Sequence, residues 1–153
     1  MTSSSEESNS DGTPMGAGPS VVVLYCQRSL ASGARPADFP AGAEGLSARL
    51  RMLPCSSKVE VWYLLQVLAE GVMGVELVCC PEKACQFLDG NDRASRRVRR
   101  AQSLLEEIGV SPERLGLSRG TALTQDDLLE RAKNRAEAIG ALDSNLTEKA
   151  KQV

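Results

Sequence analysis

The sequence predicts a single α/β domain, with a parallel sheet of about four strands flanked by helices and a disordered amino-terminal tail. Apolar runs of strand length alternate along the chain with segments of helical periodicity, which is the pattern of open α/β folds. The 153 residues suit one hydrophobic core, and 42% apolar and 25% charged residues are ordinary for a globular protein. Right-handed crossovers would gather the strands into one sheet.

The folded domain is expected over residues 20–142, between a leader at 1–19 and a polar carboxyl-terminal tail at 143–153. The leader is rich in Ser, Asn, Gly and Pro, so it cannot bury enough apolar surface to offset the entropy lost on ordering. No apolar stretch approaches the roughly 18 residues that span a bilayer, and no signal segment is evident. These patterns predict a cytoplasmic protein without membrane insertion.

In the first half of the chain, two strands and a helix are expected before the third strand. Residues 20–25 are an unbroken apolar run, typical of a central parallel strand. Residues 27–45 contain glycines and prolines, so they should form a loop with at most a short helix before a strand around Leu50. A helix is predicted over 57–70, with Trp62 on its apolar face, and a third strand over 72–78.

The second half should add two helices and a fourth strand. After a loop at 81–91, apolar residues recur at helical spacing up to about Ile108, and Gly109 ends that helix. A short strand is expected around 115–117. Thr124 resembles the cap of a final helix, whose apolar positions continue to Ile139.

The five cysteines fall mainly where predicted strands end. Cys26, Cys55 and the pair Cys79-Cys80 follow three apolar runs, and Cys85 comes five residues later. Because the carboxyl ends of parallel strands share one edge, these thiols should converge there, as in a soft-metal or iron-sulfur site. The alternative is that cysteine acts as a small buried hydrophobe, and this interpretation suits Cys79 best.

A [2Fe-2S] cluster usually takes four thiolates, and three loops provide them: Cys26, Cys55, Cys80 and Cys85. Cys55 and Cys85 each precede a predicted helix, whose amino terminus would lower the thiol pKa. The same four thiolates could instead close a structural zinc site in an assembly module, and a metal-free interaction protein is a third possibility. Since the chain contains no histidine, Ser-His and Cys-His catalysis are excluded.

The charge pattern points to a protein partner rather than to nucleic acid. The net charge is -2 and aromatic residues make up 3% of the chain, which argues against a dedicated nucleic-acid binder. Arginines crowd the helix that ends near Ile108, close to the proposed site, where they could steer an acidic redox partner or simply form a solvated helical face. The predicted docking residues are Arg93, Arg96, Arg97 and Arg100.

Several local motifs carry a family resemblance over about residues 20–140. They are the Cys-Ser-Ser-Lys-Val run at 55–59, the spacing of Cys80 and Cys85, and the segments at 104–109 and 112–115. Together they resemble the iron-sulfur delta subunit of methyl-viologen-reducing hydrogenase. The resemblance implies a small α/β protein that holds a [2Fe-2S] cluster. It also implies electron transfer between a hydrogenase or other dehydrogenase and a heterodisulfide-reductase-like flavoprotein.

Four thiols match the family's cysteine positions, while three features depart from its pattern. The matching residues are Cys26, Cys55, Cys80 and Cys85. Ser29 stands where the family has a further cysteine, Cys79 stands in place of a glycine, and 81–84 read Pro-Glu-Lys-Ala instead of His-Pro-Gly-Asp. The chain therefore resembles a divergent member, with an electron-transfer role in an oxidoreductase complex rather than that of a self-sufficient enzyme.

Overall fold

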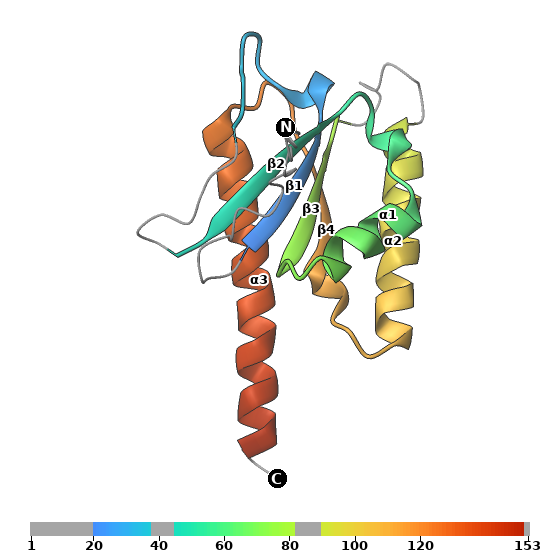
Figure 1. Cartoon of the computed structure of the whole chain (residues 1–153), viewed down its shortest axis with the longest axis vertical. Helices are drawn as coiled ribbons and strands as arrows, with labels where there is room; N and C mark the ends of the chain where they lie inside the picture. The colour runs from blue at the N-terminus through green and yellow to red at the C-terminus, as the bar shows by residue number, and fades with distance from the viewer. Residues whose placement is uncertain (1–19, 38–44, 82–89, 152–153) are drawn as a thin grey trace, which may run out of the picture.

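The computed structural model describes residues 20–37, 45–81 and 90–151, and shows a four-stranded parallel sheet between two layers of helices (Figure 1). The sheet order is β2-β1-β3-β4. Its strands are β1 (Ser20–Cys26), β2 (Ser47–Leu53), β3 (Gly74–Cys79) and β4 (Leu115–Arg119). The helices α1 (Val61–Ala69) and α2 (Gly90–Glu107) cover one face, and α3 (Gln125–Lys151) covers the other. The predicted α/β class and the parallel sheet of four strands are confirmed, whereas the leader predicted at 1–19 lies outside the described residues.

The central strands explain why the apolar runs are unbroken. Every residue of β1 and of β3 is buried. Successive side chains point to opposite faces, so Val22 and Leu24 pack with α1 and α2, while Val21 and Val23 pack beneath α3. Because both faces are covered, these strands have no position for a solvated polar side chain. Among the described residues, no helix is long and apolar enough to cross a membrane.

The helix predicted over 57–70 is divided, and this part of the prediction was wrong. Ser56–Lys58 form one turn of 3-10 helix, and α1 starts only at Val61. Val59 and Glu60 between them are extended, since Arg97 of α2 bonds to carbonyl groups of this segment. Trp62, expected on the apolar face of this helix, is 64% exposed.

The remaining elements follow the prediction more closely. The loop after β1 contains a short 3-10 helix at Gln27–Ser29. The Asp127 carboxylate accepts hydrogen bonds from both the amide and the hydroxyl of Thr124, which caps α3. That helix continues to Lys151, into the segment expected as a polar tail.

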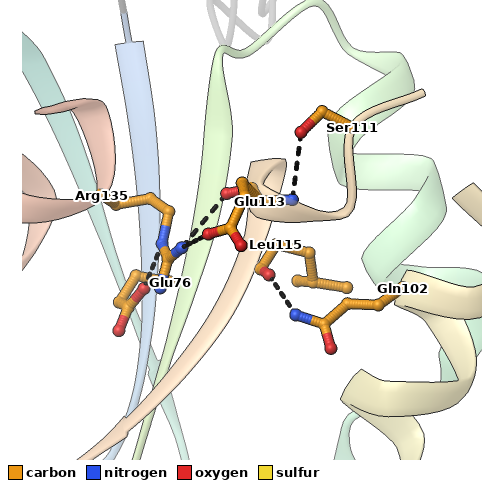
Figure 2. Close-up of polar contacts among 6 residues, drawn as sticks. All are labelled: Glu76, Gln102, Ser111, Glu113, Leu115 and Arg135. Atoms are coloured by element: carbon orange, nitrogen blue, oxygen red, sulfur yellow. Dashed lines mark hydrogen bonds and ion pairs between the residues drawn. The ribbon is translucent and has the colours of Figure 1, made fainter. Parts of the chain in front are cut away.

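A buried ion pair joins α3 to the sheet (Figure 2). The Arg135 Nε atom lies 2.7 Å from Oε2 of Glu76, a residue that is 4% exposed at the centre of β3. Nη1 of Arg135 also donates to the Glu113 carbonyl oxygen at 3.1 Å. A methyl group at position 116 would collide with the Arg135 guanidinium, so Gly116 leaves the space that this side chain occupies. The pair therefore fixes α3 over β3 and β4.

Candidate metal centre

The described cysteines lie together at the carboxyl edge of the sheet. Cys26 and Cys79 end β1 and β3, Cys80 follows directly, and Cys55 follows β2. All four are buried, with no more than 3% of any residue exposed. The parallel pairing of β1 with both β2 and β3 produces this gathering, because it aligns the ends of all three strands.

The sulfurs of Cys26 and Cys80 form a close pair at 3.4 Å. A disulfide would require about 2.05 Å. Two thiolates bound at about 2.3 Å to one tetrahedral ion would lie roughly 3.8 Å apart. The observed separation therefore suits two ligands of one metal ion after a small adjustment.

Cys55 reaches the same edge through the turn that follows β2. Its sulfur accepts a hydrogen bond from the Ser57 hydroxyl at 3.2 Å. The prediction that Cys55 immediately precedes a long helix was wrong, because only a single 3-10 turn follows it and α1 begins six residues later. A helix dipole acts within about one turn, so the hydrogen bond from the Ser57 hydroxyl, and not the start of α1, is the polar contact identified at the Cys55 sulfur.

Cys79 differs from its neighbour in its surroundings. It is fully buried in the apolar core beneath α1 and α2. Burial raises the pKa of the Cys79 thiol to about 11, against the opposing effects of a hydrogen bond with Ser56 and the positive charge of Arg119. Cys79 therefore packs within the core, whereas the Cys80 sulfur lies beside that of Cys26.

The donor set available at this edge is made of soft sulfur atoms. Within residues 20–37, 45–81 and 90–151, no three potential metal ligands are already gathered around one point. The fourth predicted ligand, Cys85, lies outside the described residues. Buried thiols fit iron-sulfur chemistry, or zinc held by four thiolates.

Ser29 has a structural role that was not predicted from the sequence, where it was noted only as the replacement of a family cysteine. It is fully buried, and its hydroxyl donates to the Cys26 carbonyl oxygen at 2.6 Å. The Ser29 carbonyl in turn accepts from the Leu123 amide at 2.9 Å. These bonds hold the turn that follows Cys26 against the segment before α3. A serine three residues after the cysteine is the local signal for such a side-chain-to-backbone bond.

Residues 21–143 match the family described as methyl-viologen-reducing hydrogenase, delta subunit. The chain belongs to this family. It is 31% identical over 132 residues to the F420-non-reducing hydrogenase vhu iron-sulfur subunit of Methanopyrus kandleri, covering 80% of this chain and 96% of that protein. The protein of the same name from Methanocaldococcus jannaschii is 27% identical over 129 residues, covering 82% and 94%. The resemblance inferred from the motifs is confirmed.

A shorter similarity extends beyond the hydrogenase delta subunits. One of the subunits of the ferredoxin:CoB-CoM heterodisulfide reductase of Methanosarcina mazei is 31% identical over 61 residues. This match covers 40% of the present chain and 8% of that protein. Part of the delta-subunit sequence is therefore similar to a small segment of a much larger redox protein.

In this delta-subunit family member, the arginines of α2 divide into two groups. Arg93, Arg96 and Arg100 are exposed. Arg97 instead faces the segment after Cys55: its Nη1 donates to the carbonyl oxygens of Ser57 and, at 2.9 Å, of Val59. Its Nη2 lies 3.4 Å from Oε1 of Glu60. Arg97 thus holds the Cys55 turn against α2.

This division predicts different effects for neighbouring arginines. We expect Arg97→Gln to lower the free energy of unfolding by about 2 kcal/mol, because it removes charged hydrogen bonds to two carbonyl groups. The exposed control Arg96→Gln should change it by less than about 0.5 kcal/mol. Urea denaturation measures both values, and equal losses would contradict the assigned role of Arg97.

Proposed function

We propose that this chain is an electron-transfer protein of an oxidoreductase complex and binds a [2Fe-2S] cluster through Cys26, Cys55, Cys80 and Cys85. The observation that carries the proposal is the buried pair of Cys26 and Cys80, whose sulfurs lie 3.4 Å apart at the edge that also holds Cys55. Two relatives, matched along nearly their whole length, are named as iron-sulfur subunits. Their names support an iron-sulfur cofactor, and the cysteine set supports a cluster held by thiolates.

When bound, the cluster would supply a one-electron site, with iron passing between the ferric and ferrous states. The chain provides the surroundings. Burial of the cysteines excludes water, and the Ser57 hydroxyl donates to the Cys55 sulfur. Hydrogen bonds to ligand sulfur stabilise added negative charge and so raise the reduction potential. Ser29 holds Cys26 through its backbone, which keeps the first ligand in place.

The partners we propose are a hydrogenase or other dehydrogenase as electron donor and a heterodisulfide-reductase-like flavoprotein as acceptor. The names of the relatives support both, since one group consists of hydrogenase subunits and another protein belongs to a heterodisulfide reductase. An electron would arrive from a reduced centre of the donor and leave to an oxidised centre of the acceptor. The chain would carry that electron without transforming a substrate of its own.

Anaerobic purification of the full chain tests the cofactor. We expect iron and acid-labile sulfide in equal amounts, visible absorption, and an electron paramagnetic resonance signal that appears only on reduction. Stoichiometric zinc in a colourless protein would overturn the proposal in favour of a structural zinc module. A folded protein that binds neither metal would overturn it in favour of an interaction module.

The exposed arginines of α2 provide a surface for an acidic partner. Arg93, Arg96 and Arg100 share one side of the helix, because residues three and four apart are neighbours there. We expect the double variant Arg96→Glu, Arg100→Glu to associate more slowly with the flavoprotein and to show a weaker salt dependence, with unchanged cluster absorbance. The rates can be measured by stopped flow.

A matched control replaces a charge at the other end of the sheet. Arg114 precedes β4, at the opposite end of that strand from the cysteine edge. Arg114→Glu should leave the association rate nearly unchanged, whereas Arg96→Glu alone should lower it. If both single variants associate as fast as the wild type at low salt, the arginines of α2 serve solubility instead.

A further inference from the structure

The fourth strand brings a positive charge to the edge where the cysteines lie. β4 ends at Arg119, which is the register partner of Cys79 on β3. In sheet order, the strand ends therefore present Cys55, then Cys26, then Cys79 with Cys80, and finally Arg119. Three strands contribute thiols and the fourth contributes a guanidinium.

The direction of the Arg119 side chain follows from the alternation along β4. Leu115 and Leu117 lie in the core beneath α1 and α2, so Arg119 lies on the same face. Its Nη2 atom is 3.9 Å from Oδ1 of Asp92 on α2, which agrees with that placement. Cys79, the register partner of Arg119, belongs to the same core.

The hydrogen bonding of Arg119 is incomplete. Its Nη1 atom is buried and has no hydrogen-bond partner among the described residues. Asp92 is a weak counterpart, because its side chain is 60% exposed and the contact is long. Arg97 and Arg135, by contrast, direct their guanidinium groups at backbone carbonyls and carboxylates. The stabilisation that Arg119 receives from Asp92 does not account for a guanidinium nitrogen buried at this edge.

We propose that Arg119 is the positive counter-charge of the thiolate site and sets the reduction potential of the cluster, an inference that rests on the proposed function. A cluster held by four thiolates is an anion, and one-electron reduction makes it more negative. A fixed cation nearby stabilises the reduced state more than the oxidised state, because the attraction grows with the charge. Arg119 therefore raises the reduction potential of the cluster through its positive charge and is not a ligand.

The test is a redox titration of the full chain, monitored by electron paramagnetic resonance. At the midpoint potential of the wild type, Arg119→Gln should lower the ratio of reduced to oxidised cluster about tenfold, which is about 59 mV for a one-electron couple. Arg119→Lys keeps the charge and should largely restore the wild-type ratio. Asp92→Asn removes the opposing carboxylate and should shift the ratio the other way, by a smaller factor.

The matched control is Arg99→Gln, since Arg99 is an exposed residue of α2 that bonds to Ser95. It should leave the ratio nearly unchanged. If Arg119→Gln unfolds more easily but titrates like the wild type, Arg119 only anchors α2 and the proposal is overturned. If Arg119→Gln does not bind a cluster, the Asp92→Asn variant decides. A ratio of reduced to oxidised cluster equal to that of the wild type in Asp92→Asn would also overturn the proposal. A wild-type chain without any cluster would instead refute the proposed function.

Discussion

We expect a Cys80→Ser variant to lose most of its bound iron, whereas the adjacent Cys79→Ser variant keeps it. The Cys80 sulfur lies 3.4 Å from that of Cys26, and a serine oxygen is a poor substitute for a soft thiolate. Cys79 is fully buried among apolar side chains, and burial raises its pKa to about 11. Cys79 belongs to the core covered by α1 and α2 and is therefore not predicted to bind iron.

The two variants control for one another, since they make the same substitution at adjacent positions. Iron and acid-labile sulfide are measured per folded chain, together with visible absorption. Serine at position 26, 55 or 85 should act like Cys80→Ser. Cys79→Ser should cost about 1 kcal/mol of unfolding free energy, because Ser56 can still pair with the new hydroxyl. If Cys79→Ser loses iron and Cys80→Ser retains it, the ligand is Cys79 and our assignment is wrong.

The largest effect on stability is expected for the ion pair between α3 and β3. Arg135→Met should lower the free energy of unfolding by about 3–5 kcal/mol, because it leaves the Glu76 carboxylate buried without its partner. Urea denaturation measures the loss. The double variant Glu76→Leu, Arg135→Met should recover most of it, since no unpaired charge then remains in the core.

An exposed pair in the same protein provides the control. Arg51 and Glu70 lie 3.4 Å apart, but their side chains are 34% and 41% exposed. Arg51→Met should therefore cost less than about 1 kcal/mol. If Arg135→Met costs no more than Arg51→Met, the buried pair does not stabilise α3 on the sheet.

The architecture could be predicted from the sequence because burial leaves a periodic pattern. A strand covered on both faces must be apolar at nearly every position, as residues 20–26 are. Amphipathic segments separated by turn residues locate α2 and α3 in the same way. Once the strands are parallel, cysteines placed after them must share one edge. Those local patterns were sufficient to predict the fold class and the edge of the sheet at which the described cysteines lie.

The contacts made by individual side chains depended on the tertiary structure. After Cys55 the chain forms a 3-10 turn and then an extended segment, because Arg97, about forty residues later, bonds to its carbonyl groups. The nearness of Cys80 to Cys26 depends on how far β3 extends beside β1. Arg119 and Arg135 likewise meet groups on other elements. Sequence periodicity reports whether a position is buried, but the partner of a long polar side chain is set by packing between segments far apart in the chain.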